Sequence, residues 1–178
     1  MSQSQTGIRV LVVDDEEGIC WALRQIIEAE GHACALARTA GEALRAVERQ
    51  AFELAFVDVK LPDFSGFELV RKIRETAADL PCVLVSGFLY SDDDLVRDAV
   101  ASGLIAGFIG KPFLLAQIEE VLQGVAAATA RDAAGPAAPS SGKPIPLGGI
   151  GGASAAGAAA AVSGLVTRKT PVSWDLQQ

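Results

Sequence analysis

Four acidic residues and one lysine in this sequence have the types and positions needed for phosphoryl chemistry. Each adjoins the end of a short apolar run, and they are Asp14, Asp15, Glu16, Asp58 and Lys111. Carboxylates that converge require a cation, and their oxygen atoms favour a hard divalent ion such as Mg²⁺. A lysine ammonium beside them is a point charge suited to a phosphoryl group. These residues therefore predict metal-assisted transfer of a phosphoryl group to an aspartate, with Glu16 in an auxiliary position.

Alternating strand and helix patterns explain how residues so far apart in the sequence come together. Apolar runs that predict strands cover 8–13, 33–37, 54–58, 81–86 and 106–110. Stretches that predict helices cover 17–30, 39–50, 65–75, 91–102 and 114–124. Continuous apolar strands between amphipathic helices indicate a doubly wound α/β fold, with a parallel sheet covered on both faces. The carboxyl ends of such strands share one edge of the sheet, where ligands bind.

Local signals mark several of the predicted helix ends. Gly31 stands just past the first predicted helix, a position that glycine commonly takes. Residues 39–42 and 65–68 have the spacing of capping boxes. Ser91 precedes three acidic residues, which suit the N-terminus of a helix. These signals support the predicted order of elements.

Charge is distributed unevenly along the chain. The 178 residues carry a formal net charge of −7, and half of them are hydrophobic. Residues 1–124 hold 11 Lys and Arg against 20 Asp and Glu, a net charge of −9, while residues 125–178 hold 4 against 2, a net charge of +2. Because nucleic acid phosphates attract positive charge, the acidic part argues against nucleic acid binding.

The cysteines and the N-terminus predict a cytoplasmic protein with reduced thiols. Cys20, Cys34 and Cys82 are widely spaced, and no C-x-x-C pair occurs. His32 is the only histidine and cannot complete a zinc site with them. Thiols of this kind are typical of reducing compartments. Residues 1–7 are polar, are predicted to be disordered, and lack the apolar segment of a signal peptide.

The composition changes after a predicted domain at residues 8–124. Residues 125–178 are rich in Ala, Gly, Ser and Pro, which predicts a largely disordered low-complexity tail. The uncharged stretch 147–167 is long enough for a membrane span, but it has too few large apolar residues to insert, so no span is expected. The segment 171–175 is either a short docking peptide or a solvated tail.

The positions around Asp58 and Lys111 sharpen the chemical prediction. Asp58 ends a strand and enters a loop, where a phosphoryl donor can reach its carboxylate. Ser86 supplies a hydroxyl at the end of another strand, and Gly87 leaves room for phosphate and exposes backbone N–H groups. Taken alone, Asp58 is better explained as a strand-end aspartate that caps a turn, and the pair Asp14 and Asp15 as charge at the N-terminus of the first predicted helix. Together they favour a single site.

Residues 8 to about 124 resemble the receiver domain of bacterial two-component response regulators. The motifs that carry the resemblance are Val-Val-Asp-Asp15, Phe-Val-Asp58, Pro62-Asp-Phe-Ser-Gly66, Val-Leu-Val-Ser86-Gly and Phe-Ile-Gly-Lys111-Pro-Phe. The resemblance implies a flavodoxin-like fold, with five parallel strands in the order 2-1-3-4-5 and five helices. It also implies that Asp58 takes a phosphoryl group from a histidine kinase or a histidine phosphotransfer protein.

Site roles follow from the same resemblance. It implies that Mg²⁺ is held by Asp15, Asp58 and the backbone carbonyl of Lys60, with Asp14 acting largely through water. The phosphoryl oxygens would be held by Ser86 and Lys111, beside Gly87.

The resemblance further implies a switch and a docking surface. Ser86 and Phe108 would form the switch pair, although Phe108 taken alone is typical of a core aromatic residue. The kinase would dock on the residues Ile19, Ala22, Pro112 and Phe113.

Three departures from the family pattern shape the expected behaviour. Phe108 stands where the family often has tyrosine. Lys60 and Phe88, two residues after Asp58 and Ser86, are neither carboxylates nor amides that would align an attacking water, so slow self-hydrolysis is expected. No DNA-binding, ATPase or cyclase pattern follows Gly124.

Two functions remain open from the sequence. The first is a single-domain response regulator, a phosphoacceptor rather than a conventional enzyme, which signals to a downstream protein through a changed binding surface and, in one variant, through a phosphorylation-dependent homodimer. The second is a pseudo-receiver that is not phosphorylated and acts as a protein-interaction module. An aspartyl-phosphate hydrolase is disfavoured, because Lys60 stands where such enzymes usually have a second aspartate.

Overall fold

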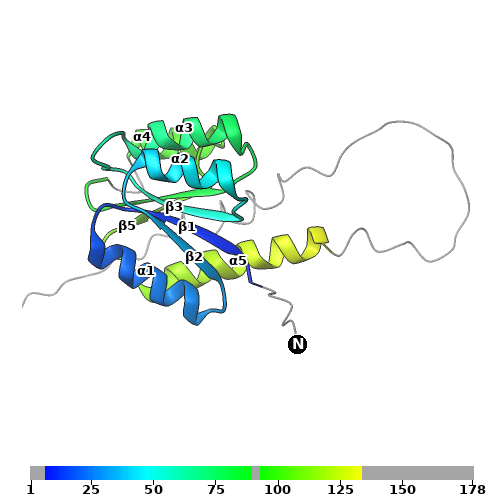
Figure 1. Cartoon of the computed structure of the whole chain (residues 1–178). Coiled ribbons are helices and arrows are strands. Elements are labelled where there is room, and N and C mark those ends of the chain that lie inside the picture. The colour runs from blue at the N-terminus through cyan, green and yellow to red at the C-terminus, as the bar shows by residue number, and fades with distance from the viewer. Residues whose placement is uncertain (1–6, 90–92, 134–178) are drawn as a thin grey trace, which may run out of the picture.

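The fold is a five-stranded parallel sheet between two layers of helices (Figure 1). The structure, a computed structural model, describes residues 7–89 and 93–133. The predictions for residues 1–6, for Ser91 as a helix cap and for the tail from residue 134 onward therefore lie outside the described residues. Among those described, none of the helices combines the length and apolarity that crossing a membrane requires.

The order of elements agrees with the prediction. The strands are β1 (Arg9–Val13), β2 (Ala33–Ala37), β3 (Leu54–Asp58), β4 (Cys82–Ser86) and β5 (Gly107–Gly110). The helices are α1 (Glu17–Ala29), α2 (Ala40–Arg49), α3 (Gly66–Thr76), α4 (Asp94–Ala101) and α5 (Leu115–Ala133). The strands pair in parallel in the order β2-β1-β3-β4-β5, which confirms the doubly wound topology.

Two apolar cores lie on the two faces of the sheet because successive strand side chains point to opposite sides. Leu11 and Val13 of β1 belong to one core, and Val10 and Val12 belong to the other. Figure 1 shows α2, α3 and α4 over the first face and α1 and α5 over the second. Burial on both faces explains why the central strands are continuously apolar.

Helix α5 is longer than predicted. Its predicted end at Gly124 is wrong, since the helix continues to Ala133. Val125 and Ala128 are buried, and Val125 lies in the same core as Val121. Alanine has the highest intrinsic helix propensity, so an alanine-rich continuation extends the helix once its apolar positions pack. The composition change at residue 125 therefore does not mark the end of ordered structure.

The predicted helix caps differ in how completely they form. At Ser65 the capping box is complete, with reciprocal bonds between Ser65 and Glu68. At Thr39 the side chain accepts from the Glu42 N–H, but the Glu42 carboxylate accepts from the Arg38 N–H. The second capping box is therefore only half formed.

Gly66 fixes the loop between β3 and α3, which leads directly from Asp58. Its N–H donates to the Val59 carbonyl at 2.8 Å. A β-carbon at this position would lie 2.3 Å from the Asp58 carbonyl oxygen and 2.9 Å from the Val59 Cα. Only glycine permits this approach of helix α3 to the end of β3.

Replacing Gly66 by alanine should lower the free energy of unfolding by about 3 kcal/mol, because the overlap is with backbone atoms that cannot rotate away. Gly18 is a matched control near the start of α1, where a β-carbon would meet nothing within 4 Å. Gly18→Ala should stabilise the chain by about 0.5–1 kcal/mol. Urea unfolding followed by circular dichroism measures both changes. Equal stability of the two variants would contradict this account of the loop.

Candidate functional site

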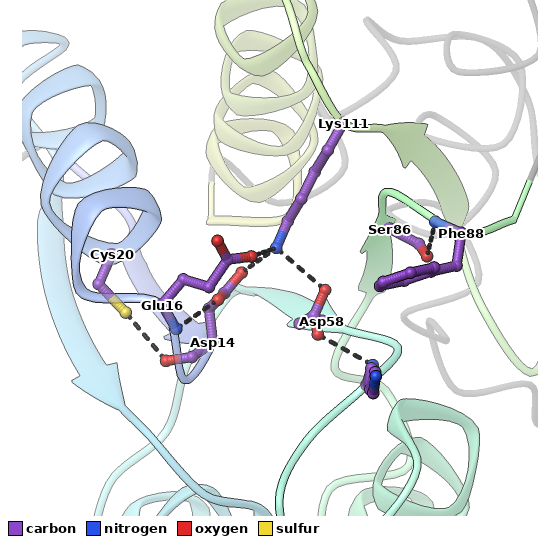
Figure 2. Close-up of polar contacts among 8 residues, drawn as sticks. Asp14, Glu16, Cys20, Asp58, Ser86, Phe88 and Lys111 are labelled. Carbon is purple, nitrogen blue, oxygen red and sulfur yellow. Dashed lines mark hydrogen bonds and ion pairs between the residues drawn. The ribbon is translucent and has the colours of Figure 1, made fainter.

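Three loops at the carboxyl edge of the sheet bring the predicted residues together. Asp14 follows β1, Asp58 ends β3, and Lys111 follows β5. Strands β1 and β3 are neighbours in the sheet, which sets their two carboxylates side by side. Lys111 reaches them from β5, and Figure 2 shows its side chain extended toward both carboxylates.

Lys111 holds the centre of the site through three ion pairs. Its Nζ atom lies 2.7 Å from Asp14 Oδ2, 3.0 Å from Glu16 Oε1 and 3.1 Å from Asp58 Oδ1. Asp14 and Asp58 are buried, and the Lys111 side chain is only 12% exposed. A charge cluster so poorly hydrated is stable only when opposite charges are paired.

Burial and pairing shift two pKa values at this centre. Burial raises the pKa of Asp14 above its usual value, although its hydrogen bonds from Lys111 and the Glu16 N–H act in the other direction. Burial lowers the pKa of Lys111, but its bonds to Asp14, Glu16 and Asp58 outweigh burial and hold that pKa above its usual value. Lys111 is therefore charged at neutral pH.

A cavity of about 620 Å³ opens beside this cluster. Its lining includes the predicted residues Asp15, Asp58, Lys60, Gly87 and Lys111. Asp15 is exposed, so its carboxylate is accessible to a ligand. Asp14 does not line this cavity; it is buried, and its two oxygens accept from Lys111 Nζ and the Glu16 N–H.

The oxygen atoms at the cavity suit Mg²⁺, which keeps several water ligands, better than they suit a metal ion whose ligands all come from protein. Within residues 7–89 and 93–133, no three His, Cys, Asp or Glu side chains form a metal-holding group. Three carboxylates line the cavity, Asp15, Glu16 and Asp58, together with Lys60, and Glu16 is already paired with Lys111. Mg²⁺ is usually bound through one or two carboxylates and keeps several waters, so this sparse set of oxygens suits it.

Ser86 ends β4, as predicted, and its hydroxyl is bonded to the backbone. It is 1% exposed, and its Oγ accepts a hydrogen bond from the Phe88 N–H at 3.1 Å. Ser86 is absent from the cavity lining, whereas Gly87 is present. A β-carbon on Gly87 would meet only Lys111 Cβ, at 3.8 Å, so the room at this glycine is open to a ligand.

Lys60 and Phe88 form a pair in the wall of the cavity. Lys60 Nζ lies 5.0 Å from the centroid of the Phe88 ring, a cation–π contact. The Lys60 N–H also donates to Asp58 Oδ2 at 2.9 Å. Phe88 is 74% exposed, so the pair lies at the surface and not in the core.

Asp63 has a positioning role that the sequence reasoning missed. Its two carboxylate oxygens accept from the N–H groups of Ala40 and Gly41, both at 2.9 Å. The slight desolvation of Asp63 raises its pKa, but the backbone bonds outweigh it and lower that pKa below its usual value. Asp63 thereby ties the β3–α3 loop to the start of α2. The only signal in the sequence is its place in the loop after Pro62.

The predicted switch residues lie in β4 and β5, and the predicted docking residues lie in α1 and after β5. Phe108 is buried, facing the core next to Leu84 of β4, which confirms the core interpretation of this ring. Ser86, two residues after Leu84, is on the same face of the sheet. The predicted docking residues all have some exposed surface. Pro112 is exposed, and the half-buried ones are Ile19, Ala22 and Phe113.

Two further features complete the site. The Lys111-Pro112 peptide bond is cis, which the sequence alone did not support.

Cys20 is buried, as predicted for a core thiol, and its S–H donates to the Asp14 carbonyl at 3.1 Å. Burial is the main cause that raises the pKa of this thiol.

Comparison with known proteins assigns a family to this arrangement. A family model described as "Response regulator receiver domain" matches residues 10–123. A curated relative is the uncharacterized transcriptional regulatory protein YkoG of Bacillus subtilis, 34% identical over 122 residues, which are 67% of this chain and 50% of that protein. The chain thus spans about half the length of this relative.

Solved structures show the same fold. A CheY-like response regulator receiver domain protein from Methanospirillum hungatei has a TM-score of 0.63 and 29% identity, covering 71% of this chain and 98% of that one. The response regulator TrrA of Thermotoga maritima, solved in complex with Mg²⁺ and BeF, has a TM-score of 0.58 and 26% identity, covering 66% of this chain and 98% of its own.

Proposed function

Since the chain belongs to the response regulator receiver domain family, we propose that it is a phosphoacceptor and that Asp58 receives the phosphoryl group from a histidine kinase or a histidine phosphotransfer protein. A carboxylate oxygen of Asp58 forms a bond to phosphorus while the donor's bond from phosphorus to the imidazole nitrogen breaks. The product is an acyl phosphate on Asp58, and the donor histidine leaves uncharged or protonated. The observation that carries this proposal is the Lys111 ammonium, held between Asp14 and Asp58 at the mouth of a cavity.

Each neighbouring residue has a distinct part in this proposal. Mg²⁺ would be held by Asp15, Asp58 and the carbonyl of Lys60, and it would neutralise charge on the phosphoryl oxygens. Asp14 acts largely through water, because its carboxylate is already bonded to Lys111. Gly87 leaves room for the phosphoryl group, and Lys111 would pair with one of its oxygens.

Signalling would follow from a rearrangement at Ser86. In the structure the Ser86 Oγ accepts from the Phe88 N–H, and toward a phosphoryl oxygen, a strong acceptor, the same hydroxyl would donate its hydrogen and move toward Asp58. Phe108, on the same sheet face, would repack and alter the surface of α4, β5 and α5. A downstream protein, or a second copy in a phosphorylation-dependent homodimer, would read that surface.

Some expectations about the whole protein stay predictions. They are that the chain acts as a single-domain regulator, that it is cytoplasmic, that it is not a conventional enzyme and that it does not bind nucleic acid. The last stands against the name of the Bacillus subtilis relative, which is a transcriptional regulatory protein.

The test is phosphate uptake by the full chain from a small acyl phosphate, read by intact mass with and without Mg²⁺. We expect one phosphoryl group, present only with Mg²⁺ and removed by hydroxylamine, which cleaves acyl phosphates. A folded chain that takes up no phosphate would overturn the proposal and favour the pseudo-receiver, a constitutive protein-interaction module.

Self-hydrolysis of the phosphorylated chain should be slow, and Lys60→Asn should accelerate it. Lys60 and Phe88 line the site, and neither has a carboxylate or an amide that would align an attacking water. An asparagine amide can align one, and we expect about a tenfold faster loss of phosphate, equivalent to about 1.4 kcal/mol of barrier. The decay is followed by intact mass after the donor is removed. Lys72→Asn is the control, since Lys72 also lies over a phenylalanine ring but away from Asp58. Equal decay in both variants would argue against this role for Lys60.

A further inference from the structure

A second hollow of about 730 Å³ lies beside the phosphorylation site, between the β3–α3 loop, α3 and α4. We call it the α3–α4 groove. Three of its apolar side chains face solvent: Phe64 is 40% exposed, Phe88 is 74% exposed and Leu95 is 52% exposed. Apolar side chains gathered around a hollow of this size are typical of a binding site rather than of scattered surface residues.

Two cationic side chains, Lys60 and Arg71, line the α3–α4 groove although residues 1–124 carry a net charge of −9. Lys60 Nζ lies over the Phe88 ring, and Lys72 Nζ lies 5.4 Å from the centroid of the Phe64 ring. Among the described residues of its lining, the acid is Glu68, which is bonded to Ser65 in the capping box. Asp93 and Asp94 precede Leu95 at the start of α4, and Asp94 is paired with Arg97. The groove therefore suits an apolar or aromatic group joined to a carboxylate.

We propose that the α3–α4 groove binds the segment Trp174-Asp175-Leu176 of the same chain. In residues 134–178, Trp174 is the only aromatic residue and Asp175 is the only acid, and the two are adjacent. The indole ring of Trp174 and the side chain of Leu176 cover the exposed rings and Leu95. The Asp175 carboxylate then pairs with the ammonium of Lys72 or the guanidinium of Arg71.

The length of chain between the domain and this segment permits the contact. Residues 134–173 supply 40 residues after the end of α5. A spacer rich in Gly, Ala and Ser has a root-mean-square span of roughly 35 Å at this length. A compact domain of this size has a radius of gyration of about 14 Å, so the spacer reaches either edge of the sheet. Tethering also raises the local concentration of the segment to about the millimolar range.

The groove adjoins the phosphorylation site, because the two hollows share a wall. Lys60, Leu61 and Phe88 line both the cavity beside Asp58 and the α3–α4 groove. A docked indole would therefore contact the Lys60–Phe88 pair that also lines the phosphorylation site. The docking itself does not rest on the proposed function.

Tryptophan fluorescence tests the docking without any phosphate chemistry. The chain has two tryptophans, so Trp21→Phe leaves Trp174 as the only one. In that full chain we expect emission at shorter wavelength, and acrylamide quenching several-fold weaker, than in a peptide of residues 168–178. Leu95→Ser should restore peptide-like quenching. The matched control Leu115→Ser changes an equally exposed leucine on α5 and should not restore it.

A charge exchange separates binding in the groove from a general change in the chain. Lys72→Glu combined with Arg71→Glu should expose Trp174 to acrylamide, and adding Asp175→Lys should restore protection. Peptide-like quenching in the Trp21→Phe chain, or protection that Leu95→Ser leaves intact, would overturn the proposal. Protection lost on dilution would also overturn it, since the segment would then lie on a second copy. Failure of Mg²⁺-dependent phosphate uptake in the intact-mass experiment would leave these fluorescence results unaffected.

Discussion

Replacing Asp58 by asparagine should abolish Mg²⁺-dependent phosphate uptake while leaving the chain folded. The amide has the shape of the carboxylate but cannot attack phosphorus and is a weaker ligand for a hard cation. Its oxygen can still accept from the Lys60 N–H or from Lys111, the two donors that Asp58 has in the structure. Intact mass after incubation with an acyl phosphate should show no added phosphoryl group. Circular dichroism should show an unchanged fold.

Asp79→Asn is the matched control for this substitution. Asp79 is an exposed aspartate in a different cavity, one lined by residues of α2, α3 and α5. That variant should take up one phosphoryl group, as the unchanged chain does. A label that persists in Asp58→Asn would place the acceptor on another residue, and peptide mapping would then identify it.

Replacing Lys111 by methionine should strongly reduce phosphate uptake and destabilise the chain in the absence of divalent cations. Asp14 and Asp58 are buried carboxylates whose shared cation partner is Lys111. Removing one partner of a buried ion pair costs about 3 kcal/mol, because the remaining charges stay desolvated and repel each other. Urea unfolding at pH 7 without Mg²⁺ measures this loss.

The pH dependence of that loss follows from the carboxylates left behind. Burial already raises the pKa of Asp14 in the folded chain, and removal of Lys111 raises it further. Between the unfolded and the folded pKa, the folded chain binds more protons than the unfolded chain, so its stability increases as pH falls through this window. The variant should therefore regain stability on acidification from pH 7.

Divalent cations provide an independent check on the same variant. Mg²⁺ should raise its midpoint of thermal unfolding more than that of the unchanged chain, because the cation replaces the missing ammonium charge. Lys72→Met is the control, and it should change the free energy of unfolding by less than about 1 kcal/mol, as expected for an exposed cation–π contact. A Lys111→Met chain as stable as the unchanged one at pH 7 would contradict the role of Lys111 as the central counter-charge.

Local patterns in the sequence were sufficient to predict the fold and the main residues of the site. Continuous apolar strands and capped helices determine a parallel α/β sheet, because each pattern depends on a few neighbouring residues. That topology alone sends Asp14, Asp58 and Lys111 to one edge, and the structure brings them within ion-pair distance. Gly31 likewise has a positive φ just past α1, as its position predicts.

Other features depend on contacts between residues distant in sequence, and only the tertiary structure decided them. The bond between Asp63 and the start of α2 spans 23 residues, and the pair of Lys111 with Asp14 spans 97. Packing also decides three other features. They are the inward position of Ser86, the wall of Lys60 and Phe88 that the two hollows share, and the extension of α5 to Ala133. A sequence determines which groups reach one edge of the sheet. Their orientation is decided by the hydrogen bonds and burial that the neighbouring elements offer, because buried polar groups must find partners wherever the packed fold places them.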